Sequence, residues 1–83
     1  MVYFVYILHS ASADRYYIGY TSNLEERLKK HRSKNRGFTS IASDWKIVYT
    51  EEFLTKQEAM HREKKIKSWK SKIMIQRLIS QKR

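Results

Sequence analysis

Cysteine is absent from this 83-residue sequence. Disulfide bonds and cysteine-ligated zinc, two common ways of stabilising a very small fold, are therefore excluded. A chain of this length is expected to form one domain over residues 1–83, with a core of marginal size. The lack of cysteine also agrees with a cytoplasmic protein.

The sequence lacks a hydrophobic run long enough to cross a membrane. Residues 1–8 are mostly apolar but too few for a span or a signal peptide, and no basic leader or cleavage site accompanies them. We therefore expect no interaction with a membrane.

Proline is absent and glycine occurs twice, so long stretches run without a break signal. Residues 55–80 contain neither, yet this stretch is too long for one helix in so small a domain. We expect a helix that opens at Thr55, with Glu58 completing a capping box, and a bend or break at residues 69–71. A short closing helix is expected after the break.

Three segments rich in aromatic and β-branched residues predict strands. Residues 2–9 carry apolar side chains on both faces, so this strand is expected to be covered on both sides. Residues 16–20 follow a polar turn and predict the returning arm of an antiparallel hairpin. Residues 45–53 predict a third strand. One face of this third strand is expected to carry the side chains of Trp45, Ile47 and Tyr49.

The second predicted strand runs into a helix that we expect to start at Thr21 or Ser22. Ser22 and Glu25 have the spacing of a capping box. A loop is expected over residues 33–44. The predicted order is strand, strand, helix, strand, helix, helix, which indicates an α+β domain with a three-stranded sheet.

Acidic residues are scarce relative to basic ones. Eight Asp and Glu against eighteen Lys and Arg give a net charge of +10, of which residues 61–83 carry +8. Basic residues at this density, interleaved with Trp69 and apolar residues, favour binding to a phosphate backbone over a merely solvated helix face. The residues predicted to bind nucleic acid are Arg62, Lys64, Lys65, Lys67, Lys70 and Lys72.

Glu63 breaks the pattern of the helix that starts near residue 55. At about 100° per residue it falls between Ala59 and Met60, inside the apolar stripe and not on the basic face. A carboxylate there is costly unless it is paired or bound to metal. Two interpretations stand: Glu63 forms a salt bridge to Arg27 or another base, or it belongs to a functional site.

Aromatic and histidine residues allow an ordinary structural interpretation. Tyr6 and Tyr17, taken alone, are typical core tyrosines with hydroxyls near the surface. His31, which with Arg27 flanks the buried face of its helix, is by itself typical of a helix end. The three histidines of the sequence show no spacing typical of a metal site.

Two short motifs, together with three later residues, resemble the GIY-YIG nuclease superfamily. Phe4-Val5-Tyr6 corresponds to the first motif and Tyr17-Ile18-Gly19 to the second; Arg27 and His31 come after them at the usual distance, and Glu63 lies further on. The pattern spans nearly the whole chain. It is most similar to short stand-alone bacterial members, which are UPF0213-like or similar to the N-terminal domain of UvrC.

The resemblance implies a three-stranded antiparallel sheet flanked by helices and metal-dependent hydrolysis of phosphodiesters, in DNA repair or recombination. Glu63 is then the one protein ligand of a divalent cation, Mg²⁺, which commonly binds one or two carboxylates and keeps several waters. Arg27 stabilises charge on the phosphate. Tyr6 and Tyr17 position the attacking water, one of them deprotonating it, and His31 assists proton transfer or orients a tyrosine.

Two features depart from the family pattern. Phe4 stands where the first motif has glycine, which a strand does not require. Larger members carry an asparagine after the catalytic glutamate, whereas the asparagines here, Asn23 and Asn35, precede Glu63. A non-catalytic nucleic-acid-binding module that retains the fold is therefore an alternative hypothesis. A structural or protein-interaction domain with incidental charge is a third.

Overall fold

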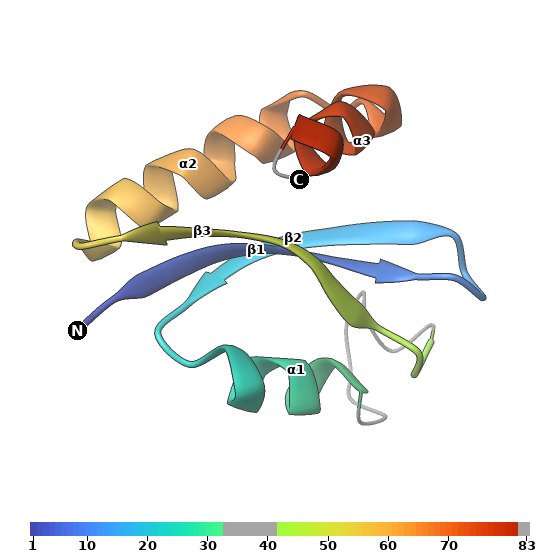
Figure 1. Ribbon diagram of the computed structural model, residues 1–83, viewed down its shortest axis with the longest axis horizontal. Helices are drawn as coiled ribbons and strands as arrows, with labels where there is room; N and C mark the ends of the chain where they lie inside the picture. The colour runs from blue at the N-terminus through green and yellow to red at the C-terminus, as the bar shows by residue number, and fades with distance from the viewer. Residues whose placement is uncertain (33–41, 82–83) are drawn as a thin grey trace.

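The structure, a computed structural model, describes residues 1–32 and 42–81. The predicted α+β order of strand, strand, helix, strand, helix, helix is confirmed (Figure 1). Most of the loop predicted over residues 33–44 lies outside the described residues. The elements are β1 (Tyr3–Ser10), β2 (Arg15–Thr21), α1 (Leu24–Arg32), β3 (Lys46–Phe53), α2 (Lys56–Ser68) and α3 (Lys72–Gln81).

The sheet places β1 between two antiparallel neighbours, in the order β2-β1-β3. Helices α2 and α3 lie on one face of the sheet and α1 lies on the other (Figure 1). Both faces of β1 are therefore covered, as its apolar composition predicts. In this arrangement β2 forms one edge of the sheet, and that edge carries the candidate functional site.

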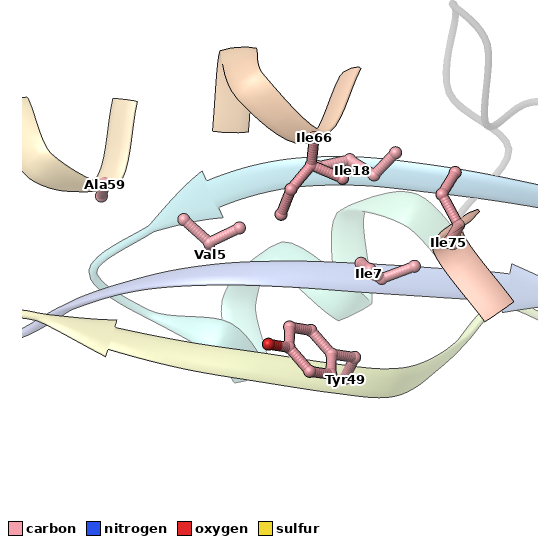
Figure 2. Packing of buried hydrophobic residues seen from close by; sticks show 7 residues of the cluster. All are labelled: Val5, Ile7, Ile18, Tyr49, Ala59, Ile66 and Ile75. Carbon is pink, nitrogen blue, oxygen red and sulfur yellow. The ribbon is translucent and has the colours of Figure 1, made fainter. Parts of the chain in front are cut away.

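Alternate residues of β1 enter two hydrophobic clusters. Val5 and Ile7 pack beneath α2 and α3 together with Ile18, Tyr49 and Ile66 (Figure 2). The intervening residues of β1 face the other way. Tyr6 and Leu8 are buried there with Trp45, and the partly buried side chains of Leu24 and Leu28 on α1 pack against them.

The pairing of β1 with β3 is irregular. Tyr49 lies opposite Ile7, whereas Ile47 and not the next residue lies opposite Leu8. One extra residue in β3 forms a bulge, which changes the face to which the following side chains point. The prediction that Trp45, Ile47 and Tyr49 share a face is therefore wrong: the first two pack on the α1 side and Tyr49 on the α2 side.

Helix α1 begins at Leu24, after both of its predicted starts, Thr21 and Ser22, and its N-cap is one residue later than the predicted capping box. The Asn23 side-chain oxygen accepts a hydrogen bond from the backbone N–H of Glu26 at 3.1 Å, so Asn23 is the N-cap in place of Ser22. The Thr21 hydroxyl accepts from the backbone N–H of Asn23 at 3.1 Å, which supports the turn from β2 into the helix.

The predicted cap and break of the C-terminal half are confirmed. Thr55 accepts from the backbone N–H of Glu58 at the start of α2. The helix ends at Ser68, and Lys70 adopts a left-handed conformation with φ of 49° before α3 begins. The Ser71 hydroxyl accepts from the backbone N–H of Met74, which caps α3. Across residues 1–32 and 42–81, no helix has the length and apolar character needed to span a membrane.

Candidate active site

The candidate site forms where Tyr6 lies across Gly19. These residues are opposite one another in the β1–β2 pairing. A Cβ atom at Gly19 would lie 2.6 Å from the Tyr6 hydroxyl oxygen and 3.1 Å from a ring carbon of Tyr17. The missing side chain thus lets the Tyr6 ring pass over the backbone of the edge strand. It is this close approach, and not a positive φ angle, that requires glycine here.

Three rings meet between this edge and α1. The Tyr6 hydroxyl and His31 Nε2 are 3.0 Å apart, within hydrogen-bonding distance, and both residues are buried. The Tyr17 ring centroid lies 4.5 Å from that of His31 and 6.3 Å from that of Tyr6. His31 lies in the last turn of α1, so α1 must extend this far to place the His31 imidazole behind the two tyrosines.

Burial governs the protonation of this pair. It raises the pKa of Tyr6, an effect that nearby Tyr17 strengthens and the Arg27 guanidinium opposes. Burial, followed by the charge of Arg27, lowers the pKa of His31. At neutral pH the pair is therefore a protonated phenol and a neutral imidazole, and the Tyr6 hydroxyl can donate to an unprotonated Nε2.

Glu63 approaches the same edge from the opposite side of the sheet. It lies on α2 between the buried residues Ala59 and Ile66, and its side chain is 15% exposed. Lys67 Nζ is 3.3 Å from the Glu63 carboxylate, one helical turn away. The salt bridge considered from the sequence thus exists, but its partner is Lys67 and not Arg27.

One solvent-open hollow of about 350 Å³ gathers these groups at the edge of β2. Tyr6, Tyr17, Arg27 and Glu63 all line it, and the buried His31 stands behind the two tyrosines. Arg27 itself is exposed. The five residues predicted to form the site therefore come together around one space, drawn from two strands and two helices.

Lys56 also lines this hollow and was missed in the sequence. It is the first residue of α2 and lies seven residues before Glu63. Seven residues are about two helical turns, so the two side chains share a face. The seven-residue spacing could have predicted that Lys56 lines the hollow, but only after Glu63 is assigned to the site.

Glu63 is the carboxylate that faces the hollow. Within residues 1–32 and 42–81, no three His, Asp or Glu side chains are grouped so as to hold a metal ion. A single carboxylate beside open space nevertheless fits Mg²⁺, which commonly binds one or two carboxylates and completes its shell with water and substrate phosphate. The donor set would suit a zinc site poorly, since such sites use several nitrogen or sulfur ligands.

Arg62 is engaged in the fold. Its guanidinium donates to both carboxylate oxygens of Glu51, at 2.9 and 3.0 Å, and Glu51 also accepts from the Tyr49 hydroxyl. The guanidinium carbon lies 5.8 Å from the centre of the Trp69 ring. These contacts connect α2 to β3, so the sequence prediction that Arg62 binds nucleic acid competes with a structural role.

The lysines predicted to bind nucleic acid differ in whether they form ion pairs. Lys67 pairs with Glu63, and Lys72 pairs with Asp14 at 2.6 Å. Of the five lysines in this predicted set, those for which no ion pair is found among the described residues are Lys64, Lys65 and Lys70.

Comparison with known proteins identifies the family. Residues 2–77 match the model of the GIY-YIG catalytic domain. UPF0213 protein OB0043 of Oceanobacillus iheyensis is 38% identical over 66 residues, covering 78% of this chain and 76% of that protein. A UPF0213 protein of Bacillus pumilus is 37% identical over 71 residues, covering 84% and 71%.

A solved structure agrees with this assignment. The solution NMR structure of the UPF0213 protein BH0048 from Bacillus halodurans superimposes with a TM-score of 0.62 at 32% identity, over 99% of this chain and 86% of that one. With its fold, its motif residues and nearly its whole length matched, the chain belongs to the GIY-YIG nuclease family, alongside the UPF0213 proteins.

Proposed function

We propose that this protein is a cytoplasmic, metal-dependent endonuclease that hydrolyses phosphodiester bonds of nucleic acid, DNA in the first place, in repair or recombination. The observation that carries the proposal is the convergence of Tyr6, Tyr17, Arg27 and Glu63 on one solvent-open hollow. The roles follow from what each side chain can do there.

Arg27 is suited to hold the phosphate. Its guanidinium is exposed at the hollow and lies near enough to Tyr6 and His31 to influence the pKa of both. A planar guanidinium binds two phosphate oxygens at once and stabilises the charge that grows on them during hydrolysis. Lys56 adds a second positive charge to the same space.

Tyr6 and Tyr17 are suited to position water. Because its pKa is raised, the Tyr6 phenol stays protonated at neutral pH and can orient water while donating to His31. His31 is neutral and buried, so it can accept that proton when the phenol takes one from the attacking water. Tyr17 is partly exposed at the hollow and offers its hydroxyl to the same water or to the phosphate.

Glu63 is suited to hold a divalent cation. Glu63 lines the same hollow of about 350 Å³ as Arg27. A bound Mg²⁺ would neutralise phosphate charge and stabilise the leaving oxygen. The protein's part is to hold Glu63 in place on α2, where Lys67 pairs with its carboxylate.

Nicking of supercoiled plasmid in the presence and absence of Mg²⁺ tests the proposal. Wild type is expected to nick only with the ion, and Glu63→Gln to be at least 100-fold slower by analogy with loss of a single charge-stabilising group. His61→Gln is the control on the same helix, because His61 is exposed, lines neither hollow described in the structure and is not among the residues predicted to bind nucleic acid. Equal nicking by wild type and Glu63→Gln would remove the mechanism.

A non-catalytic nucleic-acid-binding module remains the competing function. It is favoured by one observation: the sequence has no asparagine after Glu63, where larger members of the family carry one. This alternative predicts salt-dependent binding of DNA without Mg²⁺-dependent nicking, so the same assay combined with a binding measurement separates the two functions.

A further inference from the structure

A second, larger hollow of about 640 Å³ lies on the α2 side of the sheet. Its walls are the turn between β1 and β2, the end of α2 and the start of α3. None of the five candidate catalytic residues lines it. Its volume is within the range of about 300–1,000 Å³ that is typical of small-molecule sites.

The interior of this hollow is apolar and aromatic. Ile18, Ile66 and Ile75, all buried members of the core, form its floor. The partly buried Tyr16 adds an aromatic side chain to the wall. An apolar floor with one aromatic wall is a surface on which a flat base can pack.

The rim is basic. Arg15 and Lys70 line the hollow and are exposed, and neither pairs with a carboxylate among residues 1–32 and 42–81. Lys72 also lines it, but its charge is matched by Asp14, 2.6 Å away. Two uncompensated cations above an apolar floor suit a ligand that combines a phosphate with a base.

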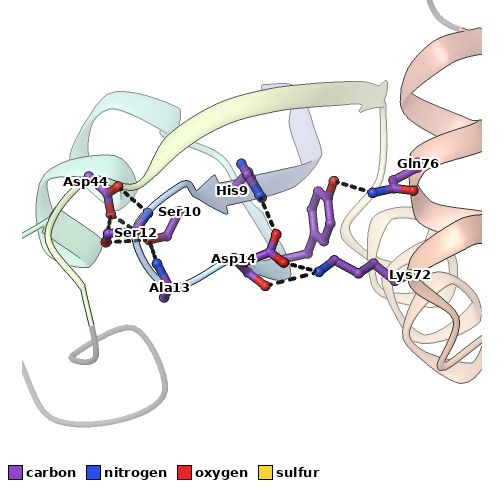
Figure 3. A network of polar contacts seen from close by, with 9 residues as sticks. His9, Ser10, Ser12, Ala13, Asp14, Asp44, Lys72 and Gln76 are labelled. Atoms are coloured by element: carbon purple, nitrogen blue, oxygen red, sulfur yellow. Dashed lines mark hydrogen bonds and ion pairs between the residues drawn. The ribbon is translucent and has the colours of Figure 1, made fainter.

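Contacts between the hairpin turn and α3 hold the hollow open in advance. Lys72 and Gln76 of α3 reach across to the turn, where Lys72 binds Asp14 (Figure 3). Gln76 donates to the Tyr16 hydroxyl at 3.4 Å, and His9 packs on the Tyr16 ring with centroids 4.7 Å apart. The walls are therefore fixed without a ligand, which lowers the ordering cost of binding.

The two hollows are neighbours along β2 and α2. Glu63 lines the candidate catalytic hollow and Lys67 lines the second, and these two side chains form an ion pair at 3.3 Å. This ion pair therefore places the two hollows next to one another along α2.

We propose that the second hollow is a subsite for one nucleotide of the substrate strand beside the scissile phosphate. The base packs on the isoleucine floor and Tyr16, and its phosphate is held by Arg15 and Lys70. The placement beside a scissile bond rests on the proposed nuclease function, whereas the binding of a nucleotide does not.

Direct binding tests this subsite without metal or catalysis. Thymidine 3′,5′-bisphosphate is added to ¹⁵N-labelled protein, and amide shifts are followed in two-dimensional NMR spectra. We expect the largest shifts at residues 13–18 and 67–72. The abasic analogue, deoxyribose 3,5-bisphosphate, is expected to bind about fivefold more weakly or worse, because it lacks the base.

Two variants distinguish binding at this subsite from non-specific attraction to the positive charge of the protein. Arg15→Gln with Lys70→Gln is expected to weaken binding of the bisphosphate about tenfold, whereas Lys29→Gln, on the opposite face of the sheet, leaves it unchanged. Amide shifts confined to Lys56 and the Arg27 region, or equal affinity for the abasic analogue, would overturn the proposal. Because binding of the bisphosphate is measured without metal or cleavage, failure of the nuclease assay and failure of the subsite are distinguished.

Discussion

Gly19 allows Tyr6 to reach the edge of the sheet, because any side chain there would occupy the space of the tyrosine hydroxyl. The edge strand of a sheet usually separates the side chains of the next strand from the sheet edge. Here the gap in β2 brings a residue of the central strand beside Glu63, which comes from the other face. The site is thus built around a missing side chain.

Gly19→Ala is expected to lower the free energy of unfolding by about 1–3 kcal/mol, as overpacking does. The new methyl group would lie 2.6 Å from the Tyr6 hydroxyl oxygen, so Tyr6 must shift from its present position beside His31. Urea denaturation measures the loss, and the His31 ring signals in NMR report the broken contact. Combining the change with Tyr6→Phe, which removes the nearest atom, should recover part of the stability. Fully additive losses would contradict this explanation.

His31 makes stability depend on pH. Its pKa is lowered in the folded state by burial and by Arg27, so the unfolded chain, with a histidine pKa near 6.5, binds more protons at mildly acid pH. Stability is therefore expected to fall as the pH drops from about 7 to 5. Urea midpoints of wild type and His31→Gln across this interval measure the effect. A slope that is as steep in His31→Gln would show that another group is responsible.

Helix α2 and helix α3 are separated by a residue in an unfavourable conformation. Lys70 has a φ of 49°, which costs a residue with a side chain about 1–2 kcal/mol relative to glycine. Lys70→Gly is therefore expected to be about 1 kcal/mol more stable than Lys70→Ala, as measured by urea denaturation, since both lose the charge but only glycine relieves the strain. Both variants should weaken nucleotide binding at the second hollow to the same extent, because each removes the Lys70 charge. Equal free energies of unfolding for Lys70→Gly and Lys70→Ala would contradict backbone strain at Lys70.

The elements were predictable where the signal was local. Alternation in β1 and the cap at Thr55 depend on neighbouring residues, and both predictions are confirmed. The N-cap of α1 was missed by one residue because Ser22–Glu25 and Asn23–Glu26 have the same capping spacing in the sequence. The sequence could not decide between them, because Ser and Asn are about equally favourable N-caps.

What depends on distant segments could not be predicted. The bulge that sends Tyr49 to the α2 face is a property of the β1–β3 register, not of the β3 sequence. The sequence identified Glu63 as a polar residue in the apolar stripe of its helix. It could not show that Glu63 and Tyr6 line one hollow, because that depends on the space left at Gly19 on the edge strand. The second hollow joins residues 13–18 to residues 66–75, and the charge pattern alone gave no sign of it.

At the scale of the whole molecule, the net charge of +10 does not describe one binding surface. Arg62 is held by Glu51 and Lys72 by Asp14, so part of the basic C-terminal half stabilises the fold. Lys70 and Arg15 line a hollow with no carboxylate paired to them in the described chain. Counting basic residues therefore overestimates the number that can meet phosphates.

The salt dependence of DNA binding distinguishes these two groups of cations. Each cation that contacts a phosphate contributes about 0.7–0.9 to the slope of log K against log salt concentration, so Arg15→Gln with Lys70→Gln is expected to reduce the slope by about 1.4–1.8. Arg62→Gln should leave the slope unchanged but lower the free energy of unfolding by about 1–3 kcal/mol, because it leaves the partly buried Glu51 without its donor.

Fluorescence anisotropy of a labelled oligonucleotide, titrated at several sodium chloride concentrations, gives these slopes, and urea denaturation gives the stability. Lys29→Gln controls for removal of an exposed charge from the opposite face of the sheet. If Arg62→Gln reduced the slope as much as the double variant, Arg62 would contact phosphate after all. The Glu51 pair would then have to open on binding, and the cations of α2 would act as one surface, as the sequence alone predicts.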